Sequence, residues 1–129
     1  MTAMQKDGKI SSKKLRHSFH YAFSGFADLL REESNARIHC IISVLVIAAG
    51  FIFRISAAEW IGVAFAIGLV LSAEAFNTAL ERLADVIQPD QDERIRDVKD
   101  LAAAAVLLCA LAAAAVGLIV FVPKIIALF

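Results

Sequence analysis

Three long apolar stretches divide the sequence, and charged residues lie between them. They cover about residues 36–54, 58–87 and 99–123. A membrane-spanning helix needs about 20 predominantly apolar residues, and the third stretch has no charge from Leu101 to Pro123. The first can span if Arg37 and Arg54 snorkel at its flanks, and the second if it tolerates acidic residues near one end. The pattern therefore predicts three transmembrane helices.

The segment before the first span, residues 13–31, has a helical pattern with two unlike faces. Apolar residues recur there at steps of three or four and so share one stripe: Leu15, Phe19, Phe23, Phe26 and Leu30. An aromatic stripe with basic neighbours is typical of a helix in the membrane interface, although a helix packed on the rest of the protein has the same pattern. We predict a disordered polar tail over residues 1–12 and one all-α membrane domain over residues 13–129.

Composition supports a membrane protein. Hydrophobic residues make up 60% of the 129 residues, and the mean hydropathy is +0.72. A soluble domain of this size could not bury so much apolar surface, whereas lipid can solvate it. The 13 basic and 13 acidic residues give a net charge of zero. The overall balance therefore points to no nucleic-acid partner, and only the placement of charge is informative.

Basic residues cluster on one side of the predicted spans, and this asymmetry predicts orientation. The opposite side has only Arg54 and Lys124. The basic side holds Lys6, Lys9, Lys13, Lys14, Arg16, Arg31, Arg37, Arg82, Arg94, Arg96 and Lys99. We therefore expect a plasma-membrane protein whose N-terminus and Arg82–Lys99 loop are cytoplasmic and whose C-terminus lies outside.

The third span is rich in small residues, with alanine runs at residues 102–105 and 112–115. Small side chains let membrane helices approach closely, and three helices alone bury little surface. We therefore expect a homo-oligomer with these alanine faces as contacts. Cys40 and Cys109 lie inside apolar runs and are interpreted as packing residues.

Four polar residues form a stripe along the end of the second span. Glu74, Asn77, Glu81 and Asp85 are separated by steps of three, four and four. At about 100° per residue, they lie within roughly 60–80° of one another on a helix. Because the rest of that helix is apolar, we expect the stripe to face protein or a wet cleft.

The acidic stripe is costly unless it has a partner. An ionised carboxylate in hydrocarbon costs at least about 2.5 kcal/mol, whereas bound cations would offset that cost. Carboxylate and amide oxygens suit Mg²⁺, especially Mg²⁺ carried on phosphates. The alternative is a helix end that has emerged into the cytoplasm. That explains Asp85 and Glu81, but it explains Glu74 poorly because Glu74 lies about two turns deeper.

Other polar groups have positions at the same membrane level. Glu32 and Glu33 precede the first span, and Lys99 and Asp100 open the third. Each has a plain explanation as a solvated charge or helix-end anchor, but their shared depth favours a common site. His20 and His39 have no ligand-spaced partner and are interpreted as packing or interfacial residues. The sequence has no phosphate-binding glycine loop, so a nucleotide would be held through metal and carboxylates.

Three motifs follow one another along the chain. The most specific is Glu74-x-x-Asn77-Thr78-Ala79-x-Glu81-x-x-x-Asp85. It is followed by Lys99-Asp100-x-Ala-x-Ala-Ala-Val106, and preceded by Glu33-x-Asn35-Ala36-Arg37-Ile38-His39. In this order they resemble the small prokaryotic diacylglycerol kinase and undecaprenol kinase family, and the likeness extends from about Lys14 to Pro123. Lys14 stands where some relatives carry arginine, and lysine lacks arginine's bidentate contact.

The resemblance implies a homotrimer of chains, each with an amphipathic surface helix and three transmembrane helices. It implies active sites shared between neighbouring subunits at the cytoplasmic face. The implied reaction transfers the γ-phosphoryl group of ATP, bound with Mg²⁺, to the hydroxyl of a membrane lipid. An apolar environment that raises a carboxylate pKa would suit a base for that hydroxyl.

Residue roles follow from the same resemblance, position by position. Glu74 would be the general base, and Asn77 would orient the cluster. Glu33 and Glu81 would hold the metal on the ATP phosphates. Nucleotide contacts would fall on Tyr21, Glu33, Glu81, Asp90, Gln91, Asp92, Lys99 and Asp100.

Two lipids and one other class of function remain open. The Asn35–His39 motif and the ending Phe121-Val122-Pro123 look more like undecaprenol kinases, with diacylglycerol as the second substrate. The alternative is a small ion-coupled transporter using Glu74 as an intramembrane carboxylate. A transporter would not need the additional group of Glu33, Asn77, Glu81, Lys99 and Asp100.

Overall fold

The computed structural model describes residues 11–129, and this part of the chain is all-helical. Its four helices are α1 (Ser12–Glu32), α2 (Ser34–Ile52), α3 (Ala57–Ile87) and α4 (Glu93–Ile126). Helices α2, α3 and α4 are long and apolar enough to cross a membrane. The predicted all-α class with three candidate spans is therefore confirmed. The predicted tail lies outside the described residues except for Ser11, which caps α1, and Ser12, which begins it.

Polar side chains cap the first turns of α1, α3 and α4. The Ser11 hydroxyl accepts a hydrogen bond from the Lys14 N–H at 3.2 Å. Ser56 and Glu59 form a reciprocal capping box at the start of α3, which satisfies N–H groups that have no partner within the helix. Asp92 caps α4 through the Arg94 N–H at 2.8 Å. This cap starts α4 at Glu93, six residues before the predicted span at residue 99.

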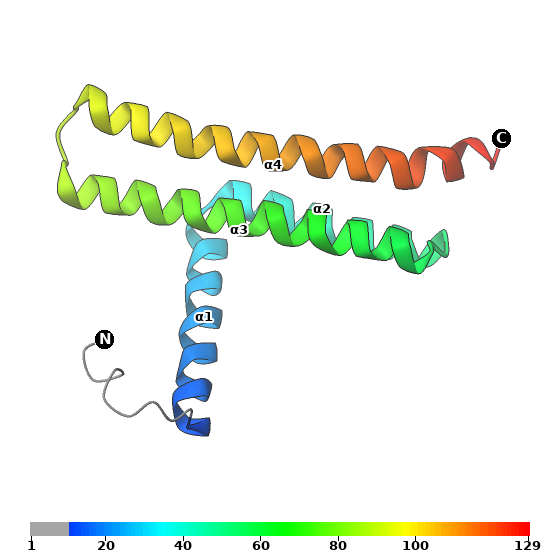
Figure 1. Cartoon of the computed structure of the whole chain (residues 1–129), viewed down its shortest axis with the longest axis horizontal. Coiled ribbons are helices and arrows are strands. Elements are labelled where there is room, and N and C mark those ends of the chain that lie inside the picture. The colour runs from blue at the N-terminus through cyan, green and yellow to red at the C-terminus, as the bar shows by residue number, and fades with distance from the viewer. Residues whose placement is uncertain (1–10) are drawn as a thin grey trace.

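Helices α2, α3 and α4 run side by side, whereas α1 extends away from them (Figure 1). Helix α3 contacts all three other helices, most extensively α4. The corner between α1 and α2 is fixed by Arg37, whose guanidinium donates to the carbonyls of Leu30 at 3.0 Å and Arg31 at 2.8 Å. Arg82 of α3 pairs with Glu32 at 2.5 Å and ties the end of α1 to the bundle.

The best-packed apolar cluster lies at the end of the bundle where α2 turns into α3. Ile55, Val63 and Val120 are its buried members, with Phe53 and Trp60 packed against them. Lys124 of α4 pairs there with Glu59 of α3 at 2.6 Å. The turn uses Arg54 in the left-handed region at φ 52°, a conformation uncommon for a residue with a side chain.

Most large apolar side chains in the described part remain exposed, including Phe65, Leu101 and Ile119 at 75%, 75% and 74%. In water such a surface would drive association. On three helices long enough to span a bilayer, it is the surface expected to face lipid or other helices.

Candidate active site

The most buried acidic side chain in the described residues is Glu74, at the middle of α3. It is 4% exposed, and Thr78 one turn away is 5% exposed; these are the buried polar residues of that part of the chain. Glu74 Oε1 lies 3.2 Å from Nε2 of His39 on α2. The sequence interpretation of His39 as a packing residue was therefore incomplete, because its ring contacts the central carboxylate.

Asn77 and Glu81 contact each other on the same helix. Asn77 Nδ2 donates to Glu81 Oε1 at 3.3 Å, as their spacing of four residues allows. Asn77 Oδ1 is buried and has no hydrogen-bond partner among the described residues. A buried acceptor without a partner costs about 1–3 kcal/mol and calls for an explanation such as an unseen ion or water.

One turn beyond Glu81 on α3, Asp85 pairs with Lys99 and so links α3 to α4. Lys99 Nζ donates to Asp85 Oδ1 at 2.6 Å. The stripe on α3 therefore has a cationic partner on the neighbouring helix. Asp100, one residue further along α4, is exposed.

The loop between α3 and α4 encloses a polar hollow of about 550 Å³. Asp85, Gln88, Asp90, Gln91, Asp92 and Lys99 are among the residues that line it. The Arg94 guanidinium and backbone N–H hold the pKa of the Asp92 carboxyl down at about 2. Both Asp92 oxygens are engaged by Arg94, at 2.8 Å to its backbone N–H and 2.9 Å to a guanidinium nitrogen. Asp92 is thus committed to capping α4, while Asp90 and Gln91 are exposed.

Glu33 lies at the corner between α1 and α2, where its backbone is extended. Its N–H donates to the Leu29 carbonyl at 2.9 Å, but its side chain makes no capping hydrogen bond to α2. Its half-buried carboxylate is therefore not used in forming either helix. Tyr21 lies on α1, 71% exposed, and lines a groove that Thr78 and Arg82 of α3 complete.

Within one chain, the predicted site residues make several separate contacts and do not form a single cluster. The structure joins Asn77 to Glu81 and gathers Asp90, Gln91, Asp92 and Lys99 around one hollow. Among residues 11–129, no three histidine, cysteine or acidic side chains group as a metal site. The sequence missed two side chains at this end, His39 and Arg82, because each contacts an acid on another helix and no spacing along the chain signals it.

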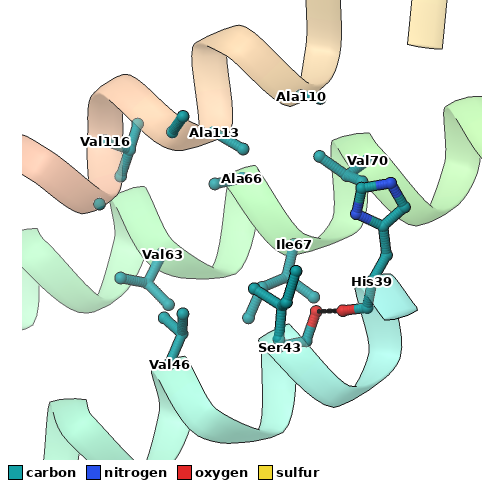
Figure 2. Close-up of a pocket in the computed structure, with 13 residues that line it drawn as sticks. His39, Ser43, Val46, Val63, Ala66, Ile67, Val70, Ala110, Ala113 and Val116 are labelled. Atoms are coloured by element: carbon teal, nitrogen blue, oxygen red, sulfur yellow. Dashed lines mark hydrogen bonds between the residues drawn. The ribbon is translucent and has the colours of Figure 1, made fainter. Parts of the chain in front are cut away.

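An apolar groove of about 270 Å³ runs between α2, α3 and α4. In Figure 2, Ala66 and Val70 of α3 lie toward Ala113 and Val116 of α4, whereas Val63 and Ile67 lie toward Val46 and Ser43 of α2. His39 lies at one end of this lining, beside Val70. A polar ring that contacts Glu74 is therefore in the wall of a groove built mostly from aliphatic side chains.

Comparisons with known proteins give a consistent result. The family described as prokaryotic diacylglycerol kinase matches residues 20–121. A Bacillus subtilis (strain 168) protein named undecaprenol kinase is 32% identical over 119 residues, 92% of this chain and 97% of that protein. A Synechocystis sp. (strain ATCC 27184 / PCC 6803 / Kazusa) protein named diacylglycerol kinase is 36% identical over 112 residues, 86% of this chain. The chain spans 64% of that second relative's length.

Proposed function

We propose a specific reaction for this chain, which belongs to the prokaryotic diacylglycerol kinase family and is a lipid kinase of the membrane. In this reaction the γ-phosphoryl group of ATP passes to the hydroxyl of a membrane lipid. The observation that carries the proposal is Glu74: a carboxylate that is 4% exposed, on a helix long enough to span the bilayer. Structural stability gives no reason to bury such a group.

Glu74 is the proposed general base. Its burial in the middle of a candidate membrane span favours a lipid hydroxyl over a water-soluble alcohol as the acceptor. It would take the proton from that hydroxyl as the oxygen attacks the γ-phosphorus and the bond to the β-phosphate oxygen breaks. Phosphoryl transfer needs chiefly in-line positioning and neutralised phosphate charge, so a single base with well-placed neighbours is chemically sufficient.

Asn77, Glu81 and Glu33 are the residues proposed to hold Mg²⁺. Their oxygens are the hard ligands that this ion prefers. Asn77 Oδ1 also fits, because it is buried without a partner among the described residues and belongs to the amide bonded to Glu81. The chemistry that bound Mg²⁺ supplies is neutralisation of negative charge on the phosphates. Asn77 Nδ2 fixes the Glu81 carboxylate for this purpose.

The nucleotide is proposed to lie at the polar hollow of the α3–α4 loop, in contact with Asp90, Gln91, Asp92, Lys99 and Asp100. Tyr21 is proposed to contact it from α1. Lys99 would exchange its bond with Asp85 for a phosphate oxygen, since an ammonium binds phosphate as a point charge. Asp92 would contribute through its backbone, because both of its side-chain oxygens are engaged by Arg94.

The complete site is proposed to form between subunits of a homotrimer. Glu33 comes from the corner between α1 and α2 and Glu81 from α3, and no three histidine, cysteine or acidic side chains group as a metal site within residues 11–129 of one chain. A neighbouring subunit could complete the set, and the exposed alanine-rich face of α4 offers a surface for close helix contact. The proposed location is the bacterial inner membrane, with the N-terminus and site cytoplasmic, because basic residues concentrate on that side.

Undecaprenol is the proposed acceptor, with diacylglycerol as the second candidate. The support is the relative named undecaprenol kinase, which matches over nearly its whole length. The apolar groove between the helices is compatible with either lipid. Lipid phosphorylation also accounts for the polar residues outside the membrane core, which an ion-coupled transporter would not require.

The test is phosphate transfer from labelled ATP in Mg²⁺-containing micelles, with undecaprenol and diacylglycerol offered separately. Glu74→Gln is compared with Glu59→Gln, a matched change in the first turn of the same helix. We expect Glu74→Gln to lower the rate by about 10²–10⁴-fold, the usual contribution of a general base. Glu59→Gln should remain close to the parent protein.

The preferred lipid is named by the faster reaction. If a folded parent oligomer phosphorylates neither lipid in the presence of Mg²⁺, the proposed reaction is wrong. If Glu74→Gln and Glu59→Gln are equally active, phosphoryl transfer stands but Glu74 is not its base.

A further inference from the structure

One side chain from another helix reaches the buried carboxylate of Glu74. His39 Nε2 lies 3.2 Å from Glu74 Oε1. The His39 side chain is 25% exposed and that of Glu74 is 6% exposed, so the contact is largely withdrawn from solvent. Among the hydrogen bonds and ion pairs of residues 11–129, this is the contact that the Glu74 carboxylate makes with another side chain.

The imidazole proton is assigned from the chemistry of the two groups. A neutral imidazole has one N–H and one bare nitrogen. A bare nitrogen facing an ionised carboxylate would place two lone pairs against each other, so an ionised Glu74, as a base requires, favours the proton on Nε2. Imidazolium also has a proton there, and both forms of His39 therefore present an N–H to Glu74.

We propose that His39 is a positioning residue for Glu74, an inference that rests on the proposed role of Glu74 as the base. The imidazole holds Oε1 and thereby fixes the rotation of the carboxylate. Oε2 is left to receive the proton of the lipid hydroxyl. A base has to be within hydrogen-bond reach of the proton it removes, and an error of about 1 Å in placement can cost about 10²-fold in rate.

The surroundings of His39 favour this role over simple packing. The ring lies in the wall of the groove lined by Val70, Ala110 and other aliphatic residues (Figure 2). An aliphatic side chain would fill that wall without burying polar atoms. The hydrogen bond that His39 accepts from Ser43 Oγ, at 2.7 Å, goes to the backbone carbonyl. Any residue at position 39 has that carbonyl, so this hydrogen bond gives no reason for an imidazole.

The experiment compares two polar replacements that differ in reach. His39→Gln can place an amide N–H close to the position of Nε2, whereas His39→Asn is too short to reach Glu74. His39→Leu removes the donor altogether, and Cys40→Ala is the control on the next residue of α2. Each is made in the full chain, checked as a folded oligomer in micelles, and assayed for ATP-dependent lipid phosphorylation.

We expect kcat to fall by about 100-fold in His39→Asn and His39→Leu, with the KM for ATP unchanged. His39→Gln should retain most of the parent rate, and Cys40→Ala all of it. The same His39 changes are then made in Glu74→Gln. Residues that act as a unit are not additive, so His39→Asn should cause little further loss once Glu74 has been replaced.

Three results would overturn the inference. The first is an active parent with His39→Asn and His39→Leu as fast as Cys40→Ala. The second is a loss that is just as large in the Glu74→Gln background, which would indicate a structural effect. The third is a His39→Gln variant no faster than His39→Asn. A parent that phosphorylates no lipid contradicts the proposed function itself, so the two failures are distinguishable.

Discussion

The two ends of the helical bundle are built in opposite ways. At the α2–α3 turn, Ile55, Val63 and Val120 are buried together, and Glu59 and Lys124 pair at 2.6 Å. At the end with the α3–α4 loop, the helices enclose a polar hollow of about 550 Å³. One end is filled by side chains, and the other is left open between them.

Polar groups are also treated differently at the two ends. Glu59 is used twice near the turn, in the capping box with Ser56 and in the pair with Lys124. Near the loop, the buried Oδ1 of Asn77 has no partner among the described residues. An unpaired buried acceptor makes folding less favourable, so the loop end gives up stability that the turn end keeps.

This difference indicates that the turn end serves mainly stability and the loop end mainly the reaction. Sites that bind and react commonly retain groups that the fold alone does not satisfy, and stability is lost there. The packed cluster at the α2–α3 turn holds α2, α3 and α4 together. It therefore helps to fix where Glu74 and Asn77 of α3 lie relative to the neighbouring helices. We therefore expect changes at the loop end to affect reaction rate and changes at the turn end to affect stability.

The largest effect that would sharpen this comparison is expected for Asn77→Leu. The change removes the amide that bonds Glu81 and a proposed ligand atom, so we expect phosphoryl transfer to fall by about 100-fold. Stability should stay the same or rise, because an unsatisfied polar atom is replaced by an apolar group of similar size. Lipid phosphorylation and thermal unfolding in the same micelles measure both effects.

Ser72→Ala is the control for Asn77→Leu, since Ser72 lies on the same helix and lines the same shallow groove beside Cys109. Its rate should match the parent. An Asn77→Leu protein that is fully active, or one that unfolds at a much lower temperature than Ser72→Ala, would contradict the division between the two ends.

The second change, Gly50→Ala, tests the packed end. A Cβ added at Gly50 would lie 2.6 Å from Trp60 Cη2 and 2.9 Å from Cζ2. The Trp60 ring already packs on Phe51, with ring centroids 4.9 Å apart, so it has little room to retreat. Overpacking of this kind costs about 1–3 kcal/mol, while the activity of the folded fraction should be unchanged.

Gly68→Ala provides the matched comparison for that measurement. A Cβ at Gly68 meets no atom within 4 Å, so the substitution adds only the gain in helix propensity, about 1 kcal/mol. Relative to the parent, the denaturation midpoint should therefore fall for Gly50→Ala and rise for Gly68→Ala. Equal midpoints would show that the turn end is not tightly packed.

Much of this architecture could be predicted from residue patterns. Apolar stretches identify the three spans because length and charge are enough to recognise them. The contact between Asn77 and Glu81 also follows from helical spacing, which brings residues four apart together. The start of α4 could not be found from hydropathy, because the polar Asp92 cap begins the helix before its apolar part does.

The candidate site was less accessible to sequence reasoning. Helical periodicity places Glu74 on a polar face, but the direction in which His39 points depends on how α2 packs against α3. The same holds for the pair of Arg82 with Glu32, which depends on the angle between α1 and the bundle. Contacts between helices are a property of packing, and no single-helix pattern specifies them. The ligand roles of Glu33 and Glu81 remain predictions for the same reason.

The smallest expected effect concerns the loop itself and the charge on Asp92. The Arg94 side chain and backbone hold the pKa of this carboxyl at about 2, below its ordinary value of 3.8. Because the folded-state pKa is the lower one, the ionised carboxylate stabilises the fold fully above pH 3.8, and that stabilisation is lost as pH falls through about 2. Asp92→Asn keeps a capping oxygen but removes the charge. The parent should therefore unfold at a slightly higher temperature than Asp92→Asn near neutral pH, and the two melting temperatures should converge as pH falls toward about 2.

Asp97→Asn, an exposed change on the same helix, controls for the general effect of removing a negative charge. A difference between parent and Asp92→Asn that persists unchanged at the lowest pH would show that the loop is held by the shape of the cap and not by its charge.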